Sequence, residues 1–214
     1  MSSSKPPSPS PASQRPPSSP IFFGPFEVTS QVFLTTPHTF ALVNLKPLLP
    51  GHVLVCPLTP HQRLTSLSPA ELTDLFTTVQ RVQRMLARHY FPATNPNRSP
   101  DLDAGAFNIA LQDGPEAGQT VPHVHVHVIP RIRGATAKEV DTPSDELYER
   151  MAGEDGNVGG WLWDAQQGRP RPAGGEFPRI EDADRKPRSM AEMEEEAEVF
   201  RGVLRGLEAE EKGR

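Results

Sequence analysis

The stretch VPHVHVHVIPR, residues 121–131, places histidines at every second position and fills the positions between them with valines. Successive side chains of a β-strand point to opposite faces of its sheet, so this spacing predicts a strand with two unlike faces. We expect the valines to face the core, and His123, His125 and His127 to form a polar surface on the other face. Burying three imidazoles for stability alone would be costly, which indicates a reactive or binding surface.

A zinc site built from all three histidines is disfavoured by the length of the strand. A strand rises about 3.3 Å per residue, which puts the Cα atoms of His123 and His127 roughly 13 Å apart. Zinc needs each ligand nitrogen at about 2.0–2.1 Å, so three such histidines can hardly converge on one ion. Two of them could join acidic ligands from elsewhere, although the single cysteine offers no cysteine-rich set. We therefore expect no structural metal.

Chemistry on a phosphate group is the interpretation that the histidine pattern favours. An imidazole titrates near pH 6.5, so its neutral form is available as a nucleophile at cellular pH. His125 has an imidazole on each side and is therefore the natural nucleophile. The flanking histidines can donate hydrogen bonds to phosphoryl oxygens or to a leaving group.

The loop before the histidines has the composition of an anion-binding loop. The sequence QDGPEAGQT, residues 112–120, contains Gly114 and Gly118, whose missing Cβ lets backbone N–H groups approach a phosphate. Gln119 and Thr120 add neutral donors, and Gln112 ends the preceding strand. Turn formation alone would also explain the two glycines. They indicate an anion-binding loop only because the histidines follow directly.

The remaining segments predict an α+β fold with a mainly antiparallel sheet. Apolar or β-branched runs predict strands at 31–36, 39–45, 52–57 and 122–130, and a strand that enters a turn at 105–114. Ser68 with Glu71, and Ser189 with Glu192, form the signature of a capping box at the start of a helix, and the first helix should end near Tyr90. Each helix carries an apolar stripe that we expect in the core, made of Leu72, Leu75, Phe76, Val79, Val82, Met85 and Leu86 in the first and Met190, Met193, Ala197, Phe200, Leu204 and Leu207 in the second.

Composition limits the organisation and the partners of the 214-residue chain. Residues 1–20, rich in proline and serine, predict a disordered tail, residues 21–150 a folded domain, 151–187 a flexible Gly/Pro-rich insert, and 188–208 a helix that packs on the domain. The net charge of −5 argues against a nucleic-acid partner. No run approaches the roughly 18 apolar residues that cross a membrane. The single Cys56, expected to pack in a strand, fits a reducing compartment, and we expect the cytoplasm with the nucleus as the open alternative.

The chain resembles the histidine triad (HIT) family, whose motif alternates three histidines with hydrophobic residues. The stretches FALVNLKPLLPGHVLVCPL (40–58) and LQDGPEAGQTVPHVHVHVIPR (111–131) resemble the fragile histidine triad branch specifically, and RSMAEMEEEAE (188–198) resembles the C-terminal helix of that branch. The resemblance covers residues 21–150 and 187–205. It implies the HIT-like fold, with a five-stranded sheet, two helices and a homodimer in which two sheets join edge to edge.

The resemblance also implies an activity, which is hydrolysis of dinucleoside polyphosphates, chiefly diadenosine triphosphate to AMP and ADP. By this match His125 becomes a nucleotidyl-histidine, His127 contacts the phosphate and assists the leaving group, and His123 supports the network. His52 matches a further histidine near the phosphates. A divalent cation, Mg or Mn, would accompany the polyphosphate without being held by the triad. The implied substrate-binding positions are Leu42, Asn44, Gln112, Gly118, Gln119, Thr120, Val121 and His127.

Some positions depart from the branch, and other functions stay open. Pro122 stands where lysine is expected, and Phe26 where a substrate-facing histidine can occur. Tyr148 matches a tyrosine that is phosphorylated in some relatives. Trp161 and Trp163 are expected to anchor the insert, with capping of the second nucleotide as the open alternative. The alternatives are a nucleoside phosphoramidase or nucleotidyl transferase of the same superfamily, and a nucleotide-bound signalling module.

Overall fold

The computed structural model describes residues 19–91, 102–136 and 187–213. The predictions for residues 1–18, for Tyr148 and for the insert with Trp161 and Trp163 lie outside these ranges. Within them, neither helix combines the length and the apolar character needed to cross a membrane.

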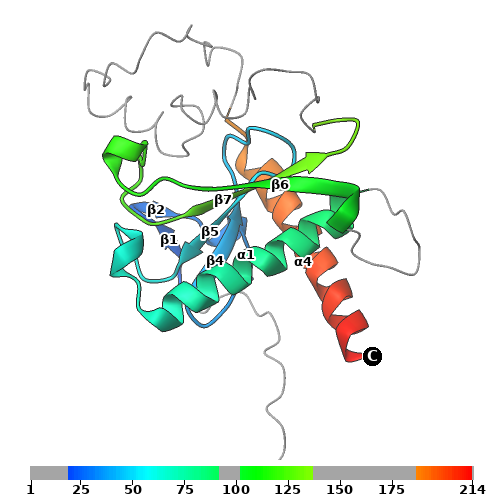
Figure 1. Cartoon of the computed structure of the whole chain (residues 1–214), viewed down its shortest axis with the longest axis horizontal. Coiled ribbons are helices and arrows are strands. Elements are labelled where there is room, and N and C mark those ends of the chain that lie inside the picture. The colour runs from blue at the N-terminus through cyan, green and yellow to red at the C-terminus, as the bar shows by residue number, and fades with distance from the viewer. Residues whose placement is uncertain (1–18, 92–101, 137–186, 214) are drawn as a thin grey trace, which may run out of the picture.

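A five-stranded sheet in the order β3-β4-β5-β7-β6 forms the centre of the molecule, and each neighbouring pair is antiparallel (Figure 1). This confirms the predicted α+β class. Two short strands at the N-terminal end form a separate hairpin, β1-β2, which the sequence analysis did not predict. The strands are β1 (Phe22–Phe23), β2 (Phe26–Glu27), β3 (Val32–Thr35), β4 (Thr39–Val43), β5 (Val53–Pro57), β6 (Gly105–Leu111) and β7 (Val126–Ile132).

Both long helices begin at the predicted capping boxes. In α1 (Pro69–Tyr90) the Ser68 hydroxyl accepts from the Glu71 N–H at 3.3 Å, and the Glu71 carboxylate accepts from the Ser68 N–H at 2.8 Å. The same pair of contacts, at 3.3 and 2.7 Å, joins Ser189 and Glu192 at the start of α4 (Met190–Lys212). Each box satisfies N–H groups that a helix start would otherwise leave without partners. Short 3-10 turns lie at η1 (Thr29–Gln31), η2 (Leu64–Ser66), η3 (Leu102–Ala104) and η4 (Pro115–Ala117).

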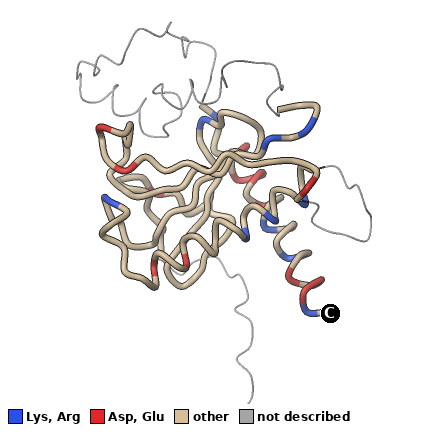
Figure 2. The backbone as a smooth tube through the Cα atoms, viewed as in Figure 1, with Lys and Arg blue, Asp and Glu red and all other residues tan. Residues whose placement is uncertain are grey.

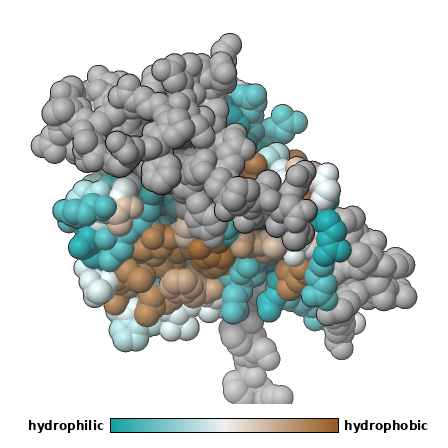
Figure 3. Space-filling model, turned by 45° about the horizontal axis from the view of Figure 1, so that its top comes forward, coloured by the Kyte–Doolittle hydropathy of each residue, from teal (hydrophilic) through white to brown (hydrophobic). Residues whose placement is uncertain are grey.

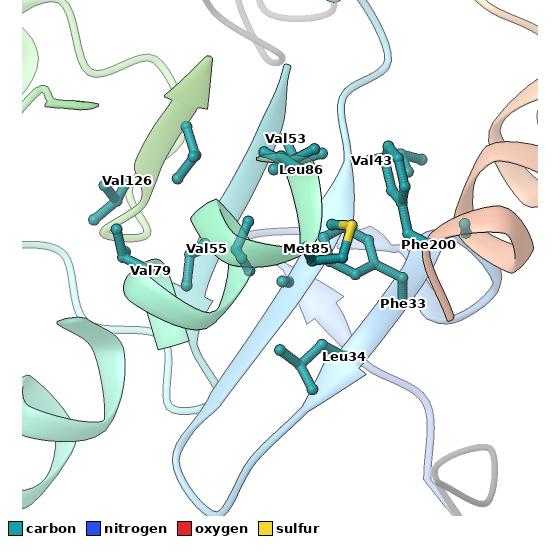
Figure 4. Close-up of a cluster of buried hydrophobic side chains, with 14 of the residues drawn as sticks. Phe33, Leu34, Val43, Val53, Val55, Val79, Met85, Leu86, Val126 and Phe200 are labelled. Carbon is teal, nitrogen blue, oxygen red and sulfur yellow. The ribbon is translucent and has the colours of Figure 1, made fainter. Parts of the chain in front are cut away.

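The main core lies between the helices and one face of the sheet. Figure 4 shows Val79, Met85 and Leu86 of α1 beside the valines of β4 and β5, with Phe200 of α4 next to Phe33. The rings of Phe33 and Phe200 meet edge to face, with centroids 5.2 Å apart. Each such side chain contributes about 1.5–3 kcal/mol when it is fully buried.

The predicted apolar stripes are wrong at three positions. Leu72, Phe76 and Met190 are 39%, 42% and 48% exposed. Leu72 and Met190 lie in the first turn of their helices, and Phe76 lies at the margin of the α1 stripe. Helical spacing identifies a face, but how much of that face the sheet covers depends on tertiary packing.

The opposite face of the sheet is apolar as well, and the β1-β2 hairpin covers part of it. Phe40, Leu42, Leu54 and Cys56 point to this side and pack against the hairpin residues Ile21 and Phe23. Burial raises the pKa of the Cys56 thiol, as expected of a packing residue. Most charged residues of the described ranges lie on helices and loops (Figure 2), and the exceptions are Glu27 in β2 and Arg131 in β7.

Candidate active site

The histidine run is only partly a strand, which corrects the prediction for 122–130. Strand β7 begins at Val126, so His123 and His125 precede it and His127 lies within it. Pro122 has no N–H to give to a ladder, and the N–H of Val124 donates to the carbonyl of His61 at 2.7 Å instead of to a strand. The alternation still holds, because Val124, Val126 and Val128 all lie in the helix-side core.

The histidines are buried, so the prediction of a polar surface is wrong. His123, His125 and His127 are 0%, 1% and 1% exposed, and His52 is equally buried. Burial disfavours a charged imidazolium and lowers the pKa of all three triad histidines, that of His125 to about 4. All three are therefore neutral at neutral pH.

His123 connects two backbone segments. The N–H of Gly24, at the turn of the β1-β2 hairpin, donates to its Nδ1 at 3.1 Å. The proton must then sit on Nε2, which donates to the carbonyl of Pro57 at 2.8 Å. Because both ring nitrogens bind backbone groups, His123 fixes the hairpin against the end of β5. The supporting role predicted for His123 in catalysis stays a prediction.

A backbone contact determines which ring nitrogen of His125 is unprotonated and can react. Its Nδ1 lies 2.8 Å from the carbonyl oxygen of His123, an acceptor that requires a proton on Nδ1. The Nε2 atom then carries the lone pair. The ring of Phe23 stands edge-on to the imidazole, with centroids 5.1 Å apart, and restricts its orientation. The arrangement suits nucleophilic attack by Nε2.

A chain of donors fixes the proton of His127. The N–H of Leu48 donates to Nδ1 of His52 at 3.1 Å, which places the proton of His52 on Nε2. That Nε2 lies 2.9 Å from Nδ1 of His127 and donates to it. His127 therefore carries its proton on Nε2, and this buried atom has no hydrogen-bond partner among the described residues. A donor beside the nucleophile, without a protein acceptor in the described ranges, suits an oxygen of a ligand.

Asn44 lies beside His52, and the start of α4 holds it in place. Its amide nitrogen is 3.2 and 3.4 Å from the two ring nitrogens of His52, and its amide oxygen accepts from the Lys46 N–H at 3.0 Å. Its main-chain carbonyl accepts from the guanidinium of Arg188, with Nε at 3.1 Å, and that guanidinium also donates to Glu196 at 2.7 Å. Arg188 was not among the residues predicted for the site, although the motif RSMAEMEEEAE begins with it.

The loop between β6 and β7 is shaped by two glycines with positive φ. Gly114 and Gly118 have φ values of 110° and 88°, which side chains with a Cβ rarely adopt. The Gln119 amide bridges the loop, accepting from the Gly114 N–H at 3.1 Å and donating to the carbonyl of Gln62 at 3.0 Å. The Thr120 hydroxyl is buried without a partner among the described residues.

The other predicted binding residues lie in two places. Gln112 lies against Gly118, where an added Cβ would stand 2.8 Å from the Gln112 amide nitrogen. Leu42 and Val121 lie in the apolar cluster under the hairpin. That cluster also includes Phe23, which the sequence analysis did not select, although the turn signal Gly24-Pro25 beside it could have indicated the hairpin.

Comparisons with known proteins identify the family of the chain. The HIT domain family model matches residues 25–134. The chain is 42% identical over 192 residues to the bis(5'-nucleosyl)-tetraphosphatase [asymmetrical] of Schizosaccharomyces pombe, covering 86% of this chain and 94% of that protein. It is 35% identical over 207 residues to the bis(5'-adenosyl)-triphosphatase of Saccharomyces cerevisiae, covering 86% and 92%.

Two solved structures share the fold. The Caenorhabditis elegans NitFhit protein superposes with a TM-score of 0.54 at 31% identity, covering 87% of this chain and 31% of that chain. The diadenosine triphosphate hydrolase of Plasmodium falciparum, solved in complex with cyclomarin A, superposes with a TM-score of 0.55 at 25% identity, covering 89% and 87%.

Proposed function

The chain belongs to the histidine triad family with the HIT domain, and we propose that it hydrolyses dinucleoside polyphosphates through a covalent nucleotidyl-histidine intermediate. The observation that carries this proposal is the contact between Nδ1 of His125 and the carbonyl of His123, at 2.8 Å, which leaves Nε2 as a buried neutral nucleophile. The names of the two yeast relatives supply the substrate class.

In the first step the lone pair of His125 Nε2 attacks the phosphorus next to one nucleoside. A P–N bond forms while the bond from that phosphorus to the bridging oxygen breaks, and the remaining nucleotide leaves with the bond's electron pair. The Nε2–H of His127 donates a hydrogen bond to the departing oxygen and stabilises the charge that develops there. The carbonyl of His123 stabilises the positive charge on the modified imidazole through the Nδ1–H of His125.

In the second step water attacks the same phosphorus and the P–N bond breaks. The electron pair of that bond returns to Nε2 of His125, the proton of the water passes to solvent, and a nucleoside monophosphate is released. With diadenosine triphosphate the two products are ADP from the first step and AMP from the second. A tetraphosphate is the second candidate substrate, because the fission yeast relative is named for one.

A divalent cation, Mg or Mn, is proposed to enter with the polyphosphate. The described residues contain no group of three His, Cys, Asp or Glu side chains that could hold a metal ion. Phosphate oxygens are ligands that Mg prefers, so the substrate would hold the ion and the ion would reduce its negative charge. Because such a cation would be bound by the substrate, the neutral histidines would not serve as metal ligands and could act on the phosphorus.

We propose that two copies pair through β6. This strand is one of the two edges of the described sheet, the other being β3, and its Ile109 side chain is 41% exposed. An unpaired edge presents backbone donors and acceptors to a second strand. Figure 3 shows apolar residues gathered on one face of the molecule. Light scattering should report a dimer that Ile109→Lys converts to a monomer, whereas the equally exposed Val199→Lys on α4 should remain dimeric; a dimeric Ile109→Lys variant contradicts the proposal.

The activity is tested by turnover of diadenosine triphosphate with magnesium, following AMP by chromatography. We expect wild-type turnover and a loss of at least about 1,000-fold in His125→Asn, with substrate binding retained. His38→Asn, on the exposed turn between β3 and β4, is the matched control and should keep full activity. Faster cleavage of an AMP-lysine amide than of the polyphosphate would overturn the proposal in favour of a phosphoramidase, and binding without turnover would favour a signalling module.

A further inference from the structure

The segment between β5 and α1 holds the loop that carries the nucleophile. We call residues 61–64 the clamp, because each makes a contact with residues 113–124. The carbonyl of His61 accepts from Val124 N–H at 2.7 Å, and that of Gln62 from the Gln119 amide at 3.0 Å. Arg63 donates to the carbonyl of Asp113 at 2.7 Å, and the Leu64 N–H donates to the Asp113 carboxylate at 2.9 Å. The loops after β5 and β6 accordingly lie at the same end of the sheet (Figure 1).

A polar side-chain contact joins the clamp to α1, beside the apolar packing of Leu64 on the core. Nε2 of His61 lies 2.9 Å from Oε1 of Glu71, in the first turn of the helix. The second carboxylate oxygen of Glu71 accepts from the N–H of Ser68 at 2.8 Å and from its hydroxyl at 2.7 Å. These donors, His61 first, lower the pKa of Glu71 to about 2, so the carboxylate is charged at neutral pH. Glu71 thus joins the helix cap to the clamp.

The position of Val124 makes this attachment relevant to catalysis. Val124 lies between His123 and His125, and the carbonyl of His123 holds the nucleophile's Nδ1–H. A shift of the Val124 amide therefore moves the group that orients the attacking nitrogen. Residues 58–63 lie outside the helices and strands. His61 is held there by its N–H, which donates to the Thr59 carbonyl at 2.8 Å, and by its side chain on Glu71.

We propose that His61, held by Glu71, is a positioning residue for the nucleophile His125. The inference rests on the proposed function, in which Nε2 of His125 attacks phosphorus. In this proposal His61 acts through the backbone: its side chain fixes its own carbonyl, which fixes Val124 and through it the histidine run. Removing the side chain should therefore slow the chemical step without weakening substrate binding.

The kinetic test compares three variants. We expect His61→Ala to lower kcat about 10- to 100-fold with KM changed by less than about twofold, because small displacements of a reacting group cost that much. His61→Gln retains a nitrogen donor for Glu71 and should recover most of the activity. Ser68→Ala removes the helix cap but keeps the contact between His61 and Glu71, so it should lower stability with kcat unchanged. A wild-type kcat in His61→Ala, or no recovery in His61→Gln, would overturn the proposal.

Hydrogen exchange of the Val124 amide, followed by NMR, tests the positioning without any substrate. Exchange should be faster in His61→Ala than in wild type and Ser68→Ala, while the Val53 amide within the sheet keeps its rate. An unchanged Val124 rate overturns the inference. If the wild type does not cleave dinucleoside polyphosphates, the proposed function fails, and exchange at Val124 alone then decides whether His61 positions this segment.

Discussion

The Nδ1 atom of His127 lies 2.9 Å from the Nε2 atom of His52, a residue 75 positions earlier in the chain. The pair forms because β5 and β7 are neighbours, with Leu54 directly opposite His127. The Leu48 N–H donates to Nδ1 of His52, so the proton of His52 lies on Nε2. His52 must then be the donor and Nδ1 of His127 the acceptor. His52 therefore decides which nitrogen of His127 carries a proton.

Replacing His52 by alanine should lower kcat about 10- to 100-fold, the range typical of groups that orient an active-site histidine. Without the donor, Nδ1 of His127 can take the proton, and its Nε2 then has none to offer. His52→Gln, which retains a donor nitrogen near the same place, should lose less. The ¹⁵N chemical shifts of His127 would report the change of tautomer, and an unchanged kcat in His52→Ala would contradict this role.

Because His127 is proposed to assist the leaving group, the loss of turnover in His127→Ala should depend on how readily that group departs. We expect His127→Ala to lose about 10²–10⁴ in turnover of diadenosine triphosphate. The loss should be much smaller with the p-nitrophenyl ester of AMP, because p-nitrophenolate leaves without a hydrogen-bond donor. Both substrates are compared by steady-state kinetics, and equal losses would mean that His127 acts elsewhere than at the departing oxygen.

The lowered pKa values of the buried histidines predict loss of stability in acid. Above the ordinary value of 6.5 the imidazoles are neutral in both the folded and the unfolded chain. As the pH falls below 6.5 the unfolded chain takes up protons that the folded protein refuses, until His125 also becomes charged near pH 4. The free energy of unfolding should therefore fall across this window, His125 alone contributing up to about 1.4 kcal/mol per pH unit.

Urea midpoints measured between about pH 7.5 and about pH 5 check this expectation. His125→Asn removes one titrating group and should show a shallower decline. A midpoint that stays level over this window, or one that rises in acid, would be inconsistent with neutral buried imidazoles.

Gly114 should tolerate alanine less well than another glycine with positive φ. Its φ is 110°, and an added Cβ would lie 1.5 Å from Nη1 of Arg63, whereas Gly134 has a φ of 74° and open space. We expect Gly134→Ala to cost about 1 kcal/mol and Gly114→Ala about 2–3 kcal/mol. Thermal unfolding measures both. In Gly114→Ala KM should also rise because the loop moves; equal costs for the two variants would show that the Arg63 contact is unimportant.

Local signals predicted the elements well. Ser68 with Glu71, and Ser189 with Glu192, sufficed to place both helix starts, because a capping box acts within four residues. The alternation of histidine and valine gave the correct faces. The alternation did not predict where β7 begins. The Val124 N–H donates to the carbonyl of His61 and not to a neighbouring strand, and no residue within 122–130 indicates this partner.

The site itself depends on contacts that no local pattern contains. The resemblance to the family, rather than spacing, selected His52 and Asn44. The contacts of Arg188 with Asn44, 144 positions apart, and of His61 with Glu71 were missed because they arise only when separate elements pack together. Burial of the histidines was missed for the same reason, since the β1-β2 hairpin that helps cover them has strands of two residues.

The strand order has a consequence for folding kinetics. Strands β3, β4 and β5 follow one another along the chain and pair as neighbours, so they can assemble by closing short loops. The pairing of β5 with β7 must instead close a loop that contains all of α1 and β6, a contact of high sequence separation that forms slowly. We expect recovery of catalytic activity during refolding to lag behind recovery of the helical circular-dichroism signal, and simultaneous recovery would contradict this order. A growing polypeptide would accordingly hold His52 in a formed meander for some time before its hydrogen-bond partner, His127, had been synthesised.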